Sequence, residues 1–283
     1  MARQTYDDGE FGDGGGSRMV MRSGYSPWTP AVKGLILANV AIFLVCFALP
    51  DGAYAFIVRW FGIDVAAWRA NAPLVPAWQL LTYGFLHSTA TLMHVGLNML
   101  TLYFFGVMLE QELGPRRLLI TYFAAQIVGG ALFLGVALLT GSEAVLLGAS
   151  GACFGVMVAA ATLWPRRSVI FIIVPMTLRT MALIFVAIEA FSVLLTLKGA
   201  PSDGVSHITH LGGALFGFVA VRTGLIHWDP VRAVAQRRVE KAVENAAEDE
   251  RRMDQLLEKI HREGMASLSK GEREFLKRVS SRR

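Results

Sequence analysis

A serine between glycines is the first place in this chain where acyl-transfer chemistry could occur. Ser150 lies in Gly148-Ala149-Ser150-Gly151, at the start of an apolar run that ends at Leu163. The tetrapeptide alone is a weak signal, because average composition yields it in roughly one chain in ten of this length. Its position is more informative, since glycines permit close backbone approach and the free N–H groups of a first helical turn can hold an anionic oxygen. Ser150 is therefore a candidate nucleophile.

Two other apolar stretches carry hydrogen-bonding side chains. His94 and Asn98 are four residues apart and therefore share one face of a helix. His210 opens a later stretch in which Gly213 and Gly217 form a GxxxG pair. Small residues at this spacing let two helices touch backbone to backbone, so we expect this helix to pack against the one that begins at the candidate serine.

The expected topology brings these side chains to one depth. If the chain crosses a membrane six times, His94, Ser150 and His210 all lie near the same side. Each has a plain alternative, since a lone histidine in a span more often bonds a neighbouring helix and a serine between glycines can simply aid packing. Together they favour a site in which His210 activates Ser150. His94, Asn98 and the helix N-terminus would supply oxyanion donors.

Composition predicts an integral membrane protein. Of 283 residues, 54% are hydrophobic and 17% are charged, which is too little charge for a soluble globule. Tryptophans, arginines and prolines in residues 50–88 predict interfacial helices. The short apolar stretch 169–174 is expected to lie in a loop. Six apolar segments approach the roughly 20 residues that a spanning helix needs; they are residues 34–49, 90–109, 118–139, 147–163, 180–197 and 208–226.

The charge distribution indicates orientation and surroundings. The net charge is +5, but the basic residues are spread over loops and the tail, so nucleic acid is not an expected partner. Their bias to one side predicts that both termini are cytoplasmic. We expect a lipid bilayer around the chain, in the plasma (inner) membrane of a bacterium. Residues 1–28, rich in Gly and Asp, are expected to be disordered, and no signal peptide is expected.

Residues 229–283 form a charged segment with helical patterning. Gly264 is expected to end a first helix, and Ser269 with Glu272 forms a capping box that would open a second. We therefore expect a soluble helical hairpin, and solvation of this tail and docking to a cytoplasmic partner are equally consistent with its charge pattern. The first helix carries one apolar stripe, formed by Met253, Leu256, Leu257 and Ile260.

Three other polar residues have structural interpretations. Glu189 lies in the fifth apolar segment without an evident acidic or basic partner, which favours a structural hydrogen bonder over a proton pathway. His87 is expected at the membrane interface, where it would orient a loop. Glu110 with Glu112, near Arg116 and Arg117, predicts a cytoplasmic turn with ion pairs of little worth.

No cofactor or metal is expected. The sequence has no P-loop, HExxH or glycine-rich dinucleotide motif. Cys46 and Cys153 have no CxxC or metal-ligand neighbour, so both are expected to be buried free thiols.

The chain resembles the rhomboid family of intramembrane serine proteases over about residues 29–228. The loop between the first two spans departs from the family pattern, which often has a Trp-Arg pair where this chain has Trp78-Gln79. That departure concerns loop and lipid contacts rather than the chemistry. Three motifs in order carry the likeness: HxxxN at His94 and Asn98, GxSG from Gly148 to Gly151, and HxxGxxxG at His210, Gly213 and Gly217.

The resemblance implies an all-α membrane protein, with a bundle of six transmembrane helices and a soluble helical tail. It implies a dyad of Ser150 and His210 with no third acid. The oxyanion hole would combine the backbone N–H of Ser150 with the side chains of His94 and Asn98. Phe154 would stack on the catalytic imidazole, and the motif glycines would support the site. The substrates would be transmembrane proteins.

Two other functions fit parts of the sequence. A catalytically silent relative would bind transmembrane helices as a chaperone, but the intact Ser150 and His210 argue against it. A transporter would be expected to show inverted repeats and interrupted helices, which the sequence lacks. In a protease, residues 199–204 would form a flexible lid on the outer side.

Overall fold

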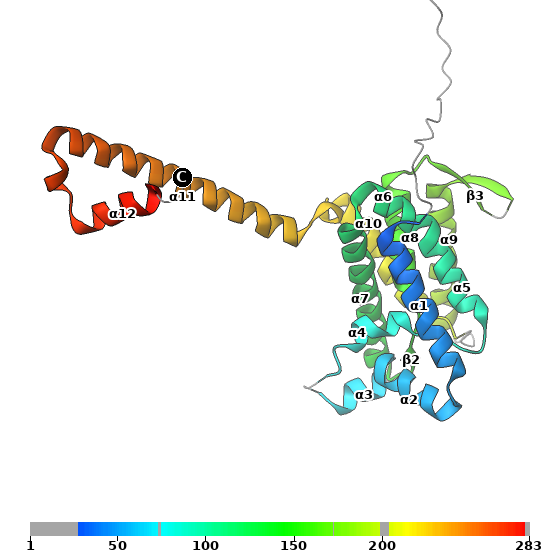
Figure 1. The fold of residues 1–283 in the computed structure, drawn as a ribbon. Coiled ribbons are helices and arrows are strands. Elements are labelled where there is room, and N and C mark those ends of the chain that lie inside the picture. Colours follow the sequence, from blue (N-terminus) through cyan, green and yellow to red (C-terminus); the bar gives the residue numbers. More distant parts are fainter. Residues whose placement is uncertain (1–27, 73–74, 172, 199–203, 281–283) are drawn as a thin grey trace, which may run out of the picture.

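The computed structural model of the chain describes residues 28–72, 75–171, 173–198 and 204–280, and these are mostly helical (Figure 1). The disorder expected for residues 1–28 falls outside these ranges except at Trp28. Most of the expected lid, residues 199–204, also falls outside them. The described residues form a helical bundle and a long helical tail.

The principal helices of the bundle differ in length. α8 has 14 residues and α10 has 16, so they extend only about 21–24 Å, less than the roughly 30 Å of a hydrocarbon core. Four helices are long and apolar enough to cross a membrane: Pro30–Ala48, Leu92–Leu113, Pro115–Thr140 and Leu178–Leu197. The prediction of a helical membrane protein is confirmed. The count of six spans is not confirmed and stays a prediction. The bounds are α1 (Pro30–Ala48), α5 (Leu92–Thr101), π-helical η2 (Leu102–Gly106), α6 (Val107–Leu113), α7 (Pro115–Thr140), α8 (Ser150–Leu163), α9 (Leu178–Leu197) and α10 (His207–Arg222).

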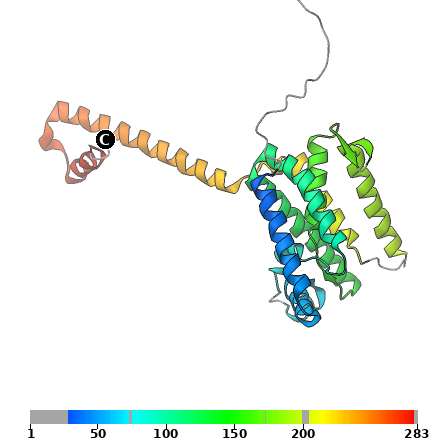
Figure 2. The same ribbon diagram turned by 45° about the vertical axis from the view of Figure 1, so that its right-hand side comes forward.

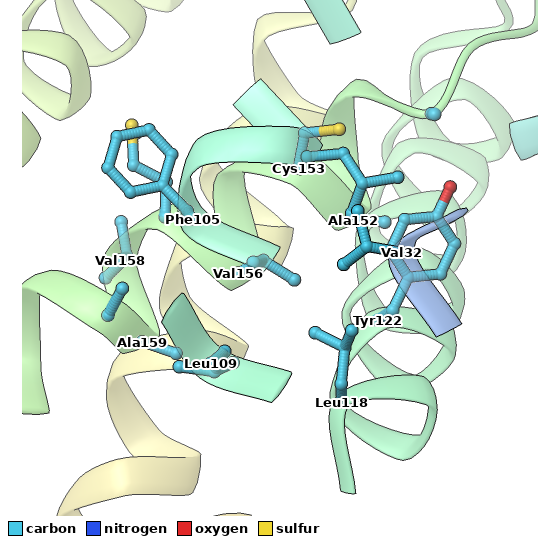
Figure 3. Close-up of a cluster of buried hydrophobic side chains, with 14 of the residues drawn as sticks. Val32, Phe105, Leu109, Leu118, Tyr122, Ala152, Cys153, Val156, Val158 and Ala159 are labelled. Carbon is cyan, nitrogen blue, oxygen red and sulfur yellow. The ribbon is translucent and has the colours of Figure 1, made fainter. Parts of the chain in front are cut away.

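Helix α8 is buried along most of its length and forms the centre of the core. Its small and apolar side chains suit this position, because neighbours contact it on several sides. Both cysteines are free and buried, as predicted. Figure 3 shows Ala152, Cys153, Val156, Val158 and Ala159 of α8 near Val32, Phe105, Leu109, Leu118 and Tyr122.

Glycines set the distance between α8 and α10, which make the most extensive helix contact of the described bundle. A Cβ atom on Gly213 would overlap the carbonyl oxygen of Gly151, and one on Gly217 would overlap that of Gly155. The two backbones therefore touch, as the GxxxG pair predicts. Helix α9 lies at the edge of the bundle, where Figure 2 shows it in yellow-green.

Gly217→Ala should destabilise the bundle because the added methyl group has no room. Overpacking of this kind costs about 1–3 kcal/mol, which a lowered melting temperature in detergent would report. The matched control is Gly34→Ala in α1, since a Cβ atom there meets nothing within 4 Å. Equal melting temperatures for the two variants would contradict the close packing.

The segment between α1 and α5 contains short helices, as predicted for residues 50–88. The side chains of Trp60 and Trp78 are exposed, and the indole N–H of Trp78 donates to the carbonyl of Trp60. Gln79 is buried and accepts hydrogen bonds from the Asp64 N–H and the Trp68 indole. The elements are α2 (Asp51–Phe61), β1 (Ile63–Asp64), α3 (Val65–Ala70), α4 (Gln79–Thr82) and the 3₁₀ helix η1 (Tyr83–Phe85).

Two short antiparallel strand pairs were not predicted. β1 pairs with β2 (Val145–Leu146), and this pair joins the segment after α2 to the chain just before α8. The assignment of residues 169–174 to a loop is wrong, because β3 (Ser168–Phe171) pairs with β4 (Val174–Thr177). Half of the residues in these two strands are β-branched and favour strands, which outweighs the proline at position 175 on an edge.

Glu110 is not part of a weakly paired turn, contrary to the prediction. Its buried carboxylate accepts hydrogen bonds from the backbone N–H groups of Ala31 and Val32, both at 2.8 Å, and from the Thr29 hydroxyl at 2.5 Å. These N–H groups belong to the first turn of α1, which has no partner for them within the helix. Glu110 therefore caps α1 from a distant part of the chain.

The tail is a helical hairpin, as predicted. α11 (Pro230–Glu263) ends at Gly264, whose φ of 80° favours glycine, and a 3₁₀ turn η4 (Met265–Ser267) leads to α12 (Lys270–Ser280). Ser269 and Glu272 exchange the two hydrogen bonds of a capping box. The Ser269 N–H and the Lys259 ammonium lower the pKa of the Glu272 carboxyl to about 2.

The apolar stripe of the tail is narrower than predicted. Leu256 packs with Leu268 and Phe275 in a small core, with Met253 and Ile260 beside it. The fourth member of the predicted stripe, Leu257, is instead exposed. Figure 1 shows α11 projecting from the bundle and α12 folding back beside it.

Candidate active site

Ser150 is the first residue of α8, and the backbone before it is held in place on both sides. The N–H of Gly148 donates to the carbonyl of Tyr83 at 3.0 Å. Gly148 has a φ of 120°, and a Cβ atom there would lie 2.7 Å from Nε2 of His94 and 3.8 Å from Oγ of Ser150. Only glycine suits this position, which lets the His94 imidazole approach the serine.

His210 lies in the first turn of α10 and contacts the serine directly. Its Nε2 atom is 2.6 Å from Oγ of Ser150. The ring stacks on Phe154, with centroids 4.5 Å apart and planes 5° apart. The glycine contact holds α8 against α10. Ser150 on α8 and His210 on α10 are therefore held at a fixed separation. The structure thus brings together the two residues that the sequence predicts as nucleophile and base.

The predicted oxyanion donors lie on α5. Nδ1 of His94 accepts from the N–H of Ser88 at 3.4 Å, so the ring proton is assigned to Nε2, the atom that faces Gly148. Nδ2 of Asn98 is buried and has no hydrogen-bond partner among the described residues. A buried amide donor without a partner costs about 1–3 kcal/mol, and a substrate oxygen could satisfy it. The N–H groups of the first turn of α8 add further donors.

His87 belongs to the site, although the sequence suggests only an interfacial position. It is 1% exposed, its Nε2 atom accepts from the N–H of Ala149 at 3.5 Å, and its ring contacts that of His94 edge-on. Burial and the adjacent His94 lower the pKa of His87, which precedes the spanning helix, to about 3. His87 is therefore neutral at physiological pH and supports the strand of chain that carries the serine. Its seven-residue spacing from His94 was the available signal.

His87→Gln should make the free energy of unfolding fall less steeply as the pH is lowered. A histidine whose folded-state pKa lies near 3, below its unfolded value of 6.5, stabilises the fold above pH 6.5 and loses that contribution as the pH falls toward 3. This group contributes a slope of up to about 1.4 kcal/mol per pH unit. Melting temperatures in detergent between about pH 7 and pH 5 should fall more steeply in the wild type than in the variant. Parallel curves would contradict the neutral buried His87.

Glu189 has two basic partners, contrary to the sequence interpretation. Its Oε2 atom lies 2.6 Å from Nδ1 of His207 and 3.0 Å from Nδ1 of His210. The sequence alone could not predict these contacts, because the register of α9 against α10 depends on packing. The three ligand-type atoms lie within 4.8 Å of one another and form a donor set of the kind that zinc binds.

Comparison with known proteins identifies the fold. A model of the rhomboid domain matches residues 76–226, more than half of the chain. The chain belongs to the rhomboid family. A second family model, a family of unknown function (DUF6576), matches residues 240–282 within the tail. Both matches fall within the predicted membrane and tail segments, whose boundaries at residues 28 and 228 stay predictions.

Individual relatives of this rhomboid are distant. Rhomboid-like protein 16, chloroplastic, of Arabidopsis thaliana is 26% identical over 74% of this chain and 67% of its own length. The human presenilin-associated rhomboid-like protein, mitochondrial, is 29% identical over 68% of this chain and 48% of its own length. Rhomboid-like protease 3 of Toxoplasma gondii is 28% identical over 46% of this chain and 47% of its own length. The chain thus spans only about half the length of several of its relatives.

Proposed function

We propose that this rhomboid is an intramembrane serine endopeptidase that cleaves peptide bonds in or near the transmembrane helices of other membrane proteins. The observation that carries the proposal is the 2.6 Å separation of Oγ of Ser150 from Nε2 of His210. Serine is a weak nucleophile until an adjacent base accepts its proton. The stacking of the imidazole on Phe154 supports the same role, because it fixes the base in one orientation.

The proposed reaction has two stages. Nε2 of His210 takes the hydroxyl proton as Oγ of Ser150 bonds to the substrate carbonyl carbon and the carbonyl π electrons move to oxygen. The oxyanion is held by His94, Asn98 and N–H groups of the first turn of α8. The tetrahedral intermediate then collapses, the C–N bond breaks, and the imidazolium gives its proton to the leaving amine.

Water completes the proposed cycle. A water molecule loses a proton to Nε2 of His210 and attacks the acyl-enzyme carbonyl. The C–Oγ bond then breaks, and Oγ recovers the proton from the imidazolium. The site uses neither a cofactor nor a metal in this scheme. A substrate helix must unwind before its carbonyl can be attacked, so segments with small or helix-breaking residues are the proposed targets.

The orientation in the membrane is also a proposal. The distribution of basic residues favours cytoplasmic termini and a site near the outer face. The plasma membrane of a bacterium remains the sequence prediction, and the relatives named chloroplastic and mitochondrial do not support that compartment. A cytoplasmic partner for the tail is a further proposal, for which the exposed, charged α11 provides a surface.

A second candidate function is a catalytically silent binder of transmembrane helices. The close contact of Ser150 with His210 favours the protease, because a binder has no need for a base beside a serine. The name protease carried by the Toxoplasma relative supports the same choice.

Ser150→Ala and His210→Ala should each abolish cleavage of a model single-pass substrate in detergent. The loss in kcat should be roughly 10⁵-fold or more, since nucleophile and base act as a unit. Asn98→Ala should lose only roughly 10²–10³-fold, because one oxyanion donor is removed while nucleophile and base remain. Gel quantification of the cleaved fragment measures all three.

The control is Ser168→Ala, which removes an exposed serine hydroxyl from β3, beyond the end of α8 opposite Ser150, and should leave kcat unchanged. Variants are compared at equal folded fractions, judged by their melting curves. Cleavage at the wild-type rate by purified Ser150→Ala protein would contradict the proposed function.

A further inference from the structure

We propose that Glu189 is a positioning residue that completes a Ser150–His210–Glu189 triad, in place of the dyad without a third acid that the family resemblance implies. The inference rests on the proposed protease function. Two distances carry it: Oγ of Ser150 is 2.6 Å from Nε2 of His210, and Nδ1 of the same ring is 3.0 Å from Oε2 of Glu189. A carboxylate on one side of an imidazole and a hydroxyl on the other is the arrangement that activates serine in hydrolases.

The carboxylate decides which ring nitrogen of His210 carries the proton. A carboxylate accepts hydrogen bonds and donates none, so it favours a proton on Nδ1. Nε2 is then left with its lone pair directed at Oγ of Ser150, as a general base requires. Stacking on Phe154 fixes the plane of the His210 ring. Glu189 contacts the edge of the same ring, at Nδ1.

Nδ1 of His210 lies within hydrogen-bonding distance of Oε2 of Glu189, but its N–H direction is poorly aligned with that oxygen. Catalytic hydrogen bonds are often loose in the absence of substrate and tighten in the Michaelis complex. The positive charge that His210 gains during attack would strengthen its attraction to Glu189. The carboxylate thus acts most strongly at the step that needs it.

His207 holds the carboxylate in place. Its Nδ1 atom is 2.6 Å from the same Oε2 atom of Glu189, a short hydrogen bond. Glu189 is 8% exposed, and a buried carboxylate is costly unless it is paired. Two histidines from one turn of α10 provide that pairing and fix the side chain of Glu189 across the gap between α9 and α10.

A metal site built from the same three residues fits the distances less well. Ligands about 2.0–2.1 Å from a tetrahedral zinc ion stand roughly 3.3 Å apart. The observed separations of 2.6 Å and 3.0 Å are those of atoms that share protons. We therefore assign the cluster to orientation of the base rather than to metal binding.

The test is the kinetics of Glu189→Gln with a single-pass substrate in detergent. Gln keeps the shape of the side chain and removes its charge, so we expect kcat to fall roughly 10²-fold or more. KM should stay within about threefold, because Glu189 touches the base and not the substrate. The matched control is Glu110→Gln, which removes the charge of another buried carboxylate, one that accepts hydrogen bonds from the start of α1. Its kcat should equal that of the wild type.

A second measurement uses the wild type alone and does not depend on how the variant folds. Nitrogen NMR of histidine-labelled protein should find the neutral His210 ring protonated at Nδ1. Protonation at Nε2, or a wild-type kcat in Glu189→Gln, would overturn the triad while leaving the proposed protease function intact. Activity that changes on addition of a chelator, together with bound zinc that Glu189→Gln loses, would also overturn it in favour of a metal site. A wild type that cleaves no substrate would overturn the proposed function itself.

Discussion

The backbone contact between α8 and α10 sets the positions of Ser150 and His210. Gly151 and Gly155 face Gly213 and Gly217 with no space for a side chain between them. Ser150 and His210 each lie within three residues of this contact, so the helix separation also fixes the distance between their side chains. Small residues are needed here because dispersion contacts between closely approaching backbones stabilise helix pairs in a membrane. The chemistry of the site therefore depends on packing that involves no catalytic group.

Buried polar groups impose the second constraint. His87, Glu110 and Glu189 are all less than a tenth exposed, where an unpaired polar group is costly. Each has a partner from a distant element: His87 accepts from the chain before α8, Glu110 from α1, and Glu189 lies against two histidines of α10. The amide nitrogen of Asn98 has no hydrogen-bond partner among the described residues, and neither has Nδ1 of His87. The unpaired Asn98 donor lies where the proposed mechanism develops negative charge.

The sequence predicts the parts of this protein whose signals are local. The GxSG, HxxxN and HxxGxxxG spacings identify the residues of the site, and the capping box at Ser269 with Gly264 predicts the tail hairpin. Contacts between distant segments that no motif marks were missed. Glu189 and Glu110 were assigned no important partner, because their partners lie 18 or more residues away. The strands of residues 168–177 were missed because a short apolar run gives no clear period. The count of six spans stays a prediction, since α8 and α10 are short helices packed together and four of the described helices are long and apolar enough to cross a membrane.

The proposed function requires Ser150 to be a nucleophile activated within the membrane domain. Its most direct test is to treat the wild-type protein, reconstituted in lipid vesicles, with a serine-directed fluorophosphonate and to locate the adduct by peptide mass spectrometry. We expect a single phosphonylated residue, Ser150, with no adduct after prior heat denaturation. An adduct on a different serine, or none on the folded protein, would contradict it.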